Sequence, residues 1–423
     1  MPVYLITGPF LSDLSLVFVS IYGLYFLFKE KSFYFHFKNL ILSLLIIFSF
    51  YTLFNSIFLS NIEVSKSSET LFFIRYVFYI IGFYYFARYQ EDTFIRTFLI
   101  FIYSCSMIVS LDLFIQFIFG KNILGFQMNE ALNGTRYSGF FNDELIAGSF
   151  LSRLMPYVII LYFLNFFNLK TVFSKILLVF SIALIFGAIL LTGERTATFY
   201  SLVFIFFFIL FLSKEKKIRK ILLILISAVL LIFISTDNDM KKRIINTTFD
   251  SFNIKSNINS VLLYSPVHHA HYATAWNIFL DNPIIGSGSK SFRYLCDNSK
   301  YIENIEFEAI NFDGVTYIEK INGCSTHPHN LFLEILSENG LIGFILFYSI
   351  YIIVIIKFIK NTLIYLRKME KDIYLIISIF CSISFLTQMF PFIPSGSFNN
   401  NWLFIFNILP LALIYIVDKK IKP

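Results

Sequence analysis

Two histidines stand where a polar segment of the chain returns to an apolar one. They are His327 and His329 in the stretch STHPHNLFLEILSENGLIGFILF, residues 325–347. An imidazole changes charge near neutral pH, so at a membrane surface it can take a proton from a hydroxyl group as a general base. We interpret His329 as a candidate base and His327 as a candidate substrate contact. The alternative for each is an ordinary residue at a helix entry.

The residues after His329 predict a closely packed helix. Asn330 stands at its start, and Glu338, Gly340 and Gly343 form the pattern E-x-G-x-x-G further along. Small residues let helices approach one another closely in a membrane. We therefore expect structural roles for the two glycines and substrate contacts from Asn330 and Glu338.

A single arginine stands in a short break between two apolar runs. Arg195 lies in LLTGERTATFYSL. A guanidinium at membrane depth is costly without an anionic partner, and its planar fork suits phosphate. Arg195 is therefore a candidate residue for binding an anion, and the alternative is an ion pair with the neighbouring Glu194. Arg75, Asp112 and Arg153 are further charges at this depth and can pair with one another.

The loop RYSGFFNDELIAGSFLSRLMP, residues 136–156, supplies further polar side chains. Arg136 and Glu144 are candidate substrate contacts. Equally, the loop's acidic residues can simply stand at a helix start, where the helix dipole favours negative charge.

The segment VLLYSPVHHAHYATAWNIFLDNPIIGSGSKSFR, residues 261–293, carries three more histidines. His268, His269 and His271 have no cysteine or carboxylate at a recognised metal-ligand spacing, so we predict a hydrogen-bonding or cationic patch and no metal site. The GSGS sequence that follows fits either backbone amides facing a phosphate or a tight turn, and the turn is the commoner explanation.

The four cysteines divide by location. Cys105 and Cys381 lie in apolar runs and are expected to pack in the core. Cys296 and Cys324 bracket a polar stretch, and an oxidising compartment would let them close a disulfide. Two free surface thiols are the alternative.

The composition requires a membrane. The 423 residues are 57% hydrophobic and 14% charged, with a mean hydropathy of +0.72, which is more apolar surface than a soluble core can bury. Lysine and arginine cluster in short runs between apolar segments, so the net charge of +7 does not predict a nucleic-acid partner. Apolar runs near the bilayer-crossing length fall at 10–28, 40–60, 71–87, 97–119, 147–165, 175–192, 196–213, 221–235, 339–359, 373–392 and 402–417. We predict an all-α polytopic transmembrane bundle of about 11–12 spans.

The basic residues predict an orientation. Loops rich in lysine and arginine alternate with loops that lack them, and the positive-inside rule places the basic loops in the cytoplasm. The same orientation brings three polar segments together on the opposite face, namely 120–146, 192–197 and 235–339.

This orientation predicts a division of the chain into three parts. They are N-terminal transmembrane helices over 1–235, a periplasmic loop domain over 236–338 and C-terminal transmembrane helices over 339–423. The middle part carries the histidine motif, so the active site is expected on the outer face.

Together these pieces resemble the O-antigen ligase and polymerase family of bacterial inner-membrane glycan transferases. The resemblance covers roughly residues 70–400 and rests on HPHNLFLEILSENGLIG, LTGERTA, NPIIGSGSKSFR and a large outer loop between late spans. It implies a fold like that of integral-membrane GT-C-type glycosyltransferases, with the active site facing the periplasm. It also implies transfer of a glycan from undecaprenyl diphosphate to a hydroxyl group, with inversion and without a metal or other cofactor.

The resemblance also assigns roles. The motif histidine corresponds to His329, a base or acceptor-positioning group, and the arginine after the transmembrane helix to Arg195, a diphosphate clamp. Where the family has a second arginine, this sequence has HHAH, with His268 nearest to the expected place and His269 beside it. Imidazole is a weaker and pH-dependent clamp. Other arginines that can supply the charge are Arg136, Arg243 and Arg293.

No readable motif encodes the acceptor. Ligation to a lipid A core and polymerisation of repeat units use nearly the same chemistry, and we favour ligation. A transporter or flippase is an alternative of another class, but it would more often show two pseudo-repeated halves with broken helices. A membrane sensor or assembly subunit is a third. The expected partners are the lipid-linked donor, the lipid A core or glycan acceptor, and the bilayer.

Overall fold

The structure is a computed structural model that describes residues 3–59, 73–131, 134–164, 172–236, 239–246, 248, 265–310, 316–368 and 372–420. The α-helices are α1 (Pro9–Lys29), α2 (Phe33–Phe37), α3 (Leu40–Phe54), α4 (Arg75–Phe119), α5 (Ala147–Phe163), α6 (Val172–Leu191), α7 (Arg195–Phe211), α8 (Lys216–Ser235), α9 (Asp239–Lys241), α11 (Pro266–Asp281), α12 (Phe292–Leu295), α13 (Leu331–Lys368), α14 (Ile373–Gln388) and α15 (Asn401–Asp418). Shorter helical turns are η1 (Asn55–Leu59), η4 (Gly139–Phe141) and η5 (Lys242–Asn246).

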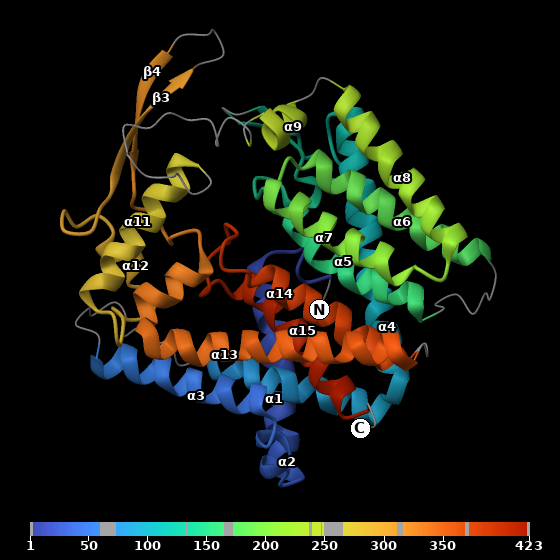
Figure 1. Cartoon of the computed structure of the whole chain (residues 1–423), viewed down its shortest axis with the longest axis horizontal. Helices are drawn as coiled ribbons and strands as arrows, with labels where there is room; N and C mark the ends of the chain where they lie inside the picture. Colours follow the sequence, from blue (N-terminus) through green and yellow to red (C-terminus); the bar gives the residue numbers. More distant parts are fainter. Residues whose placement is uncertain are drawn as a thin grey trace.

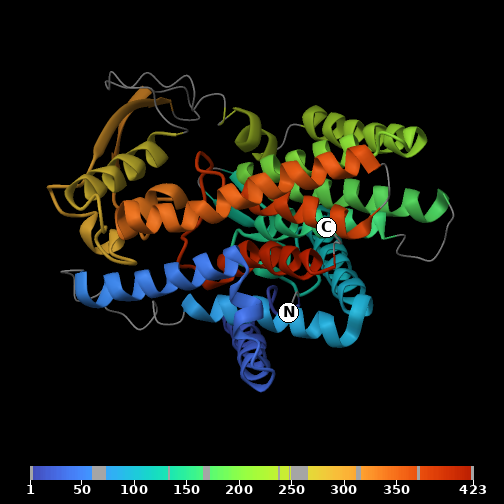
Figure 2. The same ribbon diagram turned by 60° about the horizontal axis from the view of Figure 1, so that its bottom comes forward.

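The all-α polytopic prediction is confirmed. Within the described residues, seven helices are long and apolar enough to cross a membrane, and three shorter apolar helices, α5, α7 and α14, accompany them. A helix satisfies its backbone hydrogen bonds internally, which a bilayer demands. The runs at 71–87 and 97–119, counted as two spans in the sequence, join in the single helix α4, whose halves run in different directions in Figure 2.

The bundle has two parts joined at its centre. In Figure 1, α13 runs beside α3, while α5, α6, α7 and α8 form a separate group. Helix α5 joins the parts because it contacts α4 and α14 as well as α6 and α7. Most of its side chains are buried, as its apolar sequence requires.

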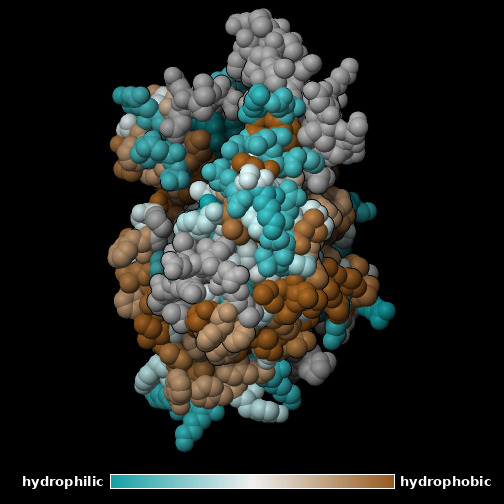
Figure 3. All heavy atoms as spheres, turned by 90° about the vertical axis from the view of Figure 1, so that its left-hand side faces the viewer, coloured by the Kyte–Doolittle hydropathy of each residue, from teal (hydrophilic) through white to brown (hydrophobic). Residues whose placement is uncertain are grey.

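The described strands form two small antiparallel hairpins. Strand β1 (Asn129–Ala131) pairs with β2 (Gly134–Arg136), and β3 (Asn304–Ile310) pairs with β4 (Thr316–Asn322). The β3–β4 hairpin packs on α11 and rises at the left of Figure 1. Figure 3 looks onto that end, where hydrophilic side chains cover the upper part of the face and apolar ones the lower part. The polar chemistry is therefore gathered at one end of an apolar body.

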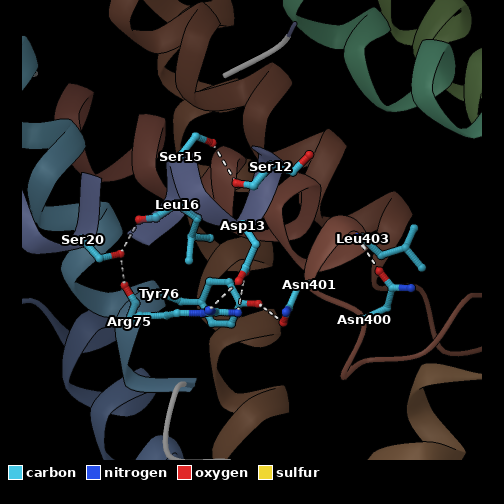
Figure 4. A network of polar contacts seen from close by, with 10 residues as sticks. All are labelled: Ser12, Asp13, Ser15, Leu16, Ser20, Arg75, Tyr76, Asn400, Asn401 and Leu403. Carbon is cyan, nitrogen blue, oxygen red and sulfur yellow. Dashed lines mark hydrogen bonds and ion pairs between the residues drawn. The ribbon is translucent and has the colours of Figure 1, made fainter. Parts of the chain in front are cut away.

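Arg75, one of the charges expected at membrane depth, pairs with a residue that the sequence did not single out. Its Nη2 atom lies 2.9 Å from Oδ1 of Asp13 on α1 (Figure 4). Its carbonyl accepts a hydrogen bond of 2.8 Å from the Ser20 hydroxyl, and the neighbouring Tyr76 hydroxyl donates to Oδ1 of Asn401 over 3.2 Å. This network ties α1 to α4 and α15.

Asp112 and Arg153 also have local partners rather than each other. The Asp112 carboxylate accepts hydrogen bonds from the Asn122 amide and the Ile123 backbone, and so holds the loop after α4. Arg153 donates to the carbonyl of Ser149, one turn earlier in α5. These contacts account for Asp112. The guanidinium of Arg153 also lies over the Tyr200 ring, and its buried Nε has no hydrogen-bond partner among the described residues.

The opposite end of the bundle carries the basic loops. Lys175 lies 2.7 Å from Glu215, which follows α7, and Lys357 lies 2.5 Å from Asp418 at the end of α15. Lys175 and Lys357 belong to basic clusters that the sequence assigned to one side of the membrane, so the pairing is consistent with that map.

The division of the chain into 1–235, 236–338 and 339–423 stays a prediction. Helix α13 begins at Leu331, inside the predicted loop domain. Residues 249–264 and 311–315 of that domain lie outside the described residues.

Candidate functional site

Four histidines gather at the polar end of the molecule. His268 and His271 come from α11, and His327 and His329 from the loop before α13. The His329 ring lies at the centre, with centroids 4.1 Å from His327, 5.4 Å from His271 and 5.9 Å from His268. Segments about sixty residues apart in the sequence thus form one imidazole cluster, which we call the histidine cluster.

Local structure explains the place of the α11 histidines. Ser265 caps the helix, since its hydroxyl accepts from the His268 amide over 3.3 Å, and Pro266 occupies the first turn, where no amide hydrogen is needed. The Ser265 hydroxyl also lies 2.7 Å from Nδ1 of His268. The cap therefore sets both the helix start and the His268 ring.

His329 has an unusual backbone that its neighbours hold in place. Its φ of 54° lies in the left-handed region, which costs energy for a residue with a side chain. Its carbonyl accepts from the Ser395 amide over 2.9 Å, and Asn330 then caps α13 by accepting from the Leu333 amide over 3.0 Å. The Asn330 side chain also donates to the Pro391 carbonyl. Asn330 is thus engaged in fixing the loop.

Burial keeps three rings of the histidine cluster neutral. It lowers the pKa of His268 and His329 to about 4 and of His327 to about 3. Positive charge on neighbouring histidines adds to the effect in each case. At neutral pH these rings are therefore unprotonated and can accept a proton.

This shift predicts a pH-dependent stability. An unfolded histidine has a pKa of 6.5, so between pH 6.5 and about 4 the unfolded chain binds more protons than the folded protein, and stability falls as the pH falls. We expect the midpoint of thermal unfolding in detergent to drop between pH 7 and pH 4.5. His327→Gln should show a smaller drop than the wild type, and an identical pH dependence of the two proteins would contradict the assignment.

Two arginines hold the TGER turn between α6 and α7. Arg136 donates from Nε to the Thr192 carbonyl over 3.1 Å, and Arg243 donates from Nε to the Gly193 carbonyl over 3.2 Å. Gly193 has a φ of 66°, which a residue without Cβ adopts at little cost. The loop after α4, the turn and the segment after α8 therefore meet, as the sequence predicted for the three polar segments.

Glu194 does not pair with Arg195, the alternative raised by the sequence. Its carboxylate caps α5 by accepting from the amides of Gly148 and Ser149 over 2.8 and 3.0 Å, and from the Ser149 hydroxyl over 2.7 Å. The first amides of a helix have no partner within it and attract negative charge. Among the described residues, the Arg195 guanidinium makes no hydrogen bond or ion pair.

The half-buried Arg195 links the turn to the histidine cluster. Its guanidinium lies within electrostatic range of Arg243 and of His268. His268 in turn responds to charge on His329. Two cations, Arg195 of α7 and Arg243 of η5, thus lie near the unprotonated His268 of α11. Glu194 is an acid within electrostatic range of Arg243, and its carboxylate is already engaged at the start of α5.

Glu338 and the glycines form a clasp between α13 and the turn after α11. The Glu338 carboxylate accepts from the Lys290 amide over 2.7 Å and from the Asn399 side chain over 3.0 Å. Helix α13 breaks at Gly340, where φ is 62°, and a Cβ on Gly340 would meet the backbone of Ile284 and Gly286. At Gly343 a Cβ would meet the Asn339 side chain, so this glycine also sits in close packing.

The GSGS sequence is a turn, and the amides of Ser287 and Gly288 face α13. The amides of Gly286, Ser287 and Gly288 donate to the carbonyls of Asn282, Ser337 and Glu338, over 2.9, 3.0 and 2.8 Å. Backbone amides already paired with carbonyls cannot bind phosphate at the same time. The turn explanation therefore holds, and the phosphate alternative finds no support.

Gly340→Ala is expected to destabilise the protein by about 2–4 kcal/mol, because it adds a backbone clash to the strain of a left-handed residue. Gly125→Ala is the matched control, since Gly125 has a φ of 86° and nothing lies near its added Cβ. Gly125→Ala should lower the free energy of unfolding only by the backbone strain, about 1 kcal/mol. Denaturant unfolding of the purified proteins measures both, and equal losses would contradict the clasp.

One segment of the chain contains both the TGER turn and the histidine cluster, and it resembles a known family. Residues 180–348 match the family model described as O-antigen ligase. The resemblance to this family is confirmed. No curated protein sequence matches the chain. The O-antigen ligase match includes the TGER turn, Arg243 and the whole histidine cluster, while Arg136 and Glu144 lie before it. The match supports the resemblance to the O-antigen ligase family over these residues of a multi-pass membrane protein.

The remaining residues that the sequence predicted as substrate contacts take no part in the contacts described above. Glu144 is exposed and its amide closes a turn onto Phe141, while Arg293 is exposed on α12 and reaches His327 electrostatically. His269 is half-buried on α11. Their substrate contacts stay predictions.

Cys296 and Cys324 form a disulfide, with their Cα atoms 4.8 Å apart. It joins the end of α12 to the loop that leads to His327. Cys105 and Cys381 are free and buried, as their apolar surroundings predicted.

Some important residues carried little signal in the sequence. Glu334 accepts from the Ser397 hydroxyl and the Phe398 amide over 2.6 and 2.7 Å, which anchors the loop before α15. Its spacing of four residues from Glu338 places both on one helix face, and that spacing was the available signal. Arg243 stands in no motif, so only the structure reveals its contact with Gly193.

Proposed function

We propose that this protein transfers a glycan from undecaprenyl diphosphate to an acceptor hydroxyl at the outer face of the bacterial inner membrane. The observation that carries the proposal is Arg195, a half-buried guanidinium without an anionic partner among the described residues, near the unprotonated His268 of the histidine cluster. A cation left unpaired in such a place favours an anionic ligand. The match to the O-antigen ligase family supports a lipid-linked glycan as that ligand.

The diphosphate of the donor would face the positive end of this region. Arg195 presents its planar fork, and Arg243 and Arg136 add positive charge from behind the TGER turn. Negative charge grows on the diphosphate oxygen as its bond to the sugar breaks. Fixed guanidinium groups stabilise that charge best when they need no rearrangement.

The acceptor hydroxyl would approach His329. The hydroxyl oxygen forms a bond to the anomeric carbon, its proton passes to an unprotonated nitrogen of His329, and the bond from that carbon to the diphosphate oxygen breaks with its electron pair. Attack from the face opposite the leaving group inverts the anomeric centre. His329 is neutral at neutral pH and is thus in the form that a base requires.

Ligation to a lipid A core is the function we favour, and repeat-unit polymerisation is the second candidate of the same family. The test supplies purified protein with undecaprenyl-diphosphate-linked glycan and, separately, a lipid A core or a second glycan chain. A lipid A conjugate supports the ligase, and lengthened lipid-linked chains support the polymerase. Neither product, with a donor that a known transferase accepts, would reject glycan transfer and favour a transporter or flippase.

The orientation has its own test. With the disulfide intact, Ser299→Cys should be labelled by a membrane-impermeant thiol reagent from outside, while Ser213→Cys should be protected until the membrane is opened. Both side chains are exposed and lie on opposite sides of the predicted map. The reverse labelling pattern would place the histidine cluster in the cytoplasm.

A further inference from the structure

His271 is a member of the histidine cluster whose hydrogen position the fold determines. Its Nδ1 atom lies 3.0 Å from the carbonyl oxygen of Gly323. A carbonyl oxygen only accepts hydrogen bonds, so Nδ1 must carry the hydrogen. In the neutral ring, Nε2 is then left with a lone pair that can accept a hydrogen bond.

The Gly323 carbonyl cannot move easily. A Cβ on Gly323 would meet Thr274, the Ala270 carbonyl and the Glu303 carbonyl, so the glycine is pressed against α11 and the start of β3. The next residue, Cys324, is held by the disulfide to Cys296. His271 itself is buried. The disulfide, the glycine and the helix therefore fix the orientation of the His271 ring.

The fixed ring stands next to His329. The two ring centroids are 5.4 Å apart and the planes are inclined by 33°. An N–H···N hydrogen bond of ordinary length places two imidazole centroids roughly 5 Å apart. Since the His329 backbone is already held through Ser395, rotation of the His329 side chain is the movement that would close this contact.

We infer that His271 is a positioning residue for His329, and that its Nε2 accepts the N–H of the His329 ring during transfer. This inference rests on the proposed function. The other nitrogen of His329 is thereby left unprotonated and aimed at the acceptor hydroxyl. When that nitrogen takes the proton, His329 becomes an imidazolium ion, and His271 stabilises it as a neutral acceptor without taking a proton itself.

Other charges face this pair from the surrounding elements. His268 and Arg195 lie on the α11 and α7 sides, and His327 and Arg293 lie on the α13 and α12 sides. His268 and His327 also carry nitrogens that can accept a hydrogen, but their Nδ1 atoms face the hydroxyls of Ser265 and Thr326, which can donate or accept. His271 differs from them because its Nδ1 faces a carbonyl, which leaves Nε2 as the accepting nitrogen.

The test compares two substitutions at His271 in the full-length protein. His271→Asn keeps an amide that can donate to the Gly323 carbonyl, but no atom of asparagine reaches His329. We expect kcat for transfer to fall on the order of 10–100-fold, with KM for the lipid-linked donor unchanged. His271→Gln places an amide oxygen near the position of Nε2, and it should recover part of the lost kcat.

Trp276→Phe is the control, because this exposed residue lies on the same helix, two turns from His268, and its described ring contact is with Phe279 rather than with a cluster residue. It should leave kcat and KM unchanged. Thermal unfolding of each variant reports folding separately. A folded His271→Asn protein with wild-type kcat, or one whose KM rises while kcat is retained, would overturn the inference. Absence of transfer by the wild type in the same assay would instead reject the proposed function.

Discussion

Replacing His329 should lower the rate of glycan transfer about 10²- to 10⁴-fold, the usual loss when a general base is removed. His329→Asn is the most informative change, because asparagine tolerates the left-handed backbone that His329 adopts at a φ of 54°. It removes the proton acceptor and leaves the loop before α13 in place. His329→Ala adds backbone strain, so its loss of activity would mix two causes. Initial rates with saturating donor measure the effect.

Folding is the rival explanation, and the controls address it. Both His329 variants must reach wild-type levels in the membrane, and Ser299→Ala, an exposed change on the same face, should transfer at the wild-type rate. A well-folded His329→Asn protein with near-normal transfer would make His329 a helix-entry residue, and the catalytic role would fail.

Replacing Arg195 should lower transfer by a similar amount, about 10²- to 10³-fold, because a preorganised cation at the leaving group is lost. Arg195→Lys should remain impaired, since an ammonium group cannot reproduce the planar two-pronged contact with a phosphate. Binding of the lipid-linked donor should weaken in both Arg195→Ala and Arg195→Lys. Arg88→Lys, a change at an exposed pair with Glu30 away from the site, is the matched control and should have no effect.

The unfolding temperature of the variants shows whether Arg195 binds a ligand or stabilises the fold. The Arg195 guanidinium forms no hydrogen bond or ion pair among the described residues, and it lies near another cation, Arg243. Arg195→Ala should therefore leave the unfolding temperature unchanged or raise it. Glu194→Ala should lower that temperature, because the cap of α5 is lost. The opposite order of the two variants would contradict the assignment.

The helices and the polar face could be predicted because hydropathy and charge are read directly along the chain. Long apolar runs must become helices in a bilayer, and alternating basic loops imply which polar segments share a face. The contacts of Arg136 with Thr192 and of Arg243 with Gly193 agree with that reasoning. The two runs that form α4 show its limit, since local composition does not reveal whether a short polar break ends a helix.

Partners across the fold could not be predicted from neighbours in sequence. Glu194 stands beside Arg195, yet its carboxylate satisfies the amides that begin α5, because those donors have no other partner in the helix. Gly286 of GSGS similarly meets Gly340 rather than an outside ligand. In both cases a tertiary contact, which no local pattern encodes, decides what the residue does.

In the histidine cluster, one residue could be predicted from the sequence and another only from the fold. The HPH motif identified His329 directly, because its place at a membrane entry is visible in the sequence. His271 belongs to a run of three histidines that looked alike, and only its contact with the Gly323 carbonyl distinguishes it. The disulfide pairing required the fold for the same reason, since spacing along the chain does not show that two sulfur atoms meet.

The most direct test of the proposed chemistry is acceptor-dependent release of undecaprenyl diphosphate by the purified protein. The donor carries a label on its lipid, and release is followed with and without a hydroxyl-bearing acceptor. We predict rapid release by the wild type only when acceptor is present, and release slowed at least 100-fold in both His329→Asn and Arg195→Lys. Equal release by the wild type and the two folded variants would contradict the account.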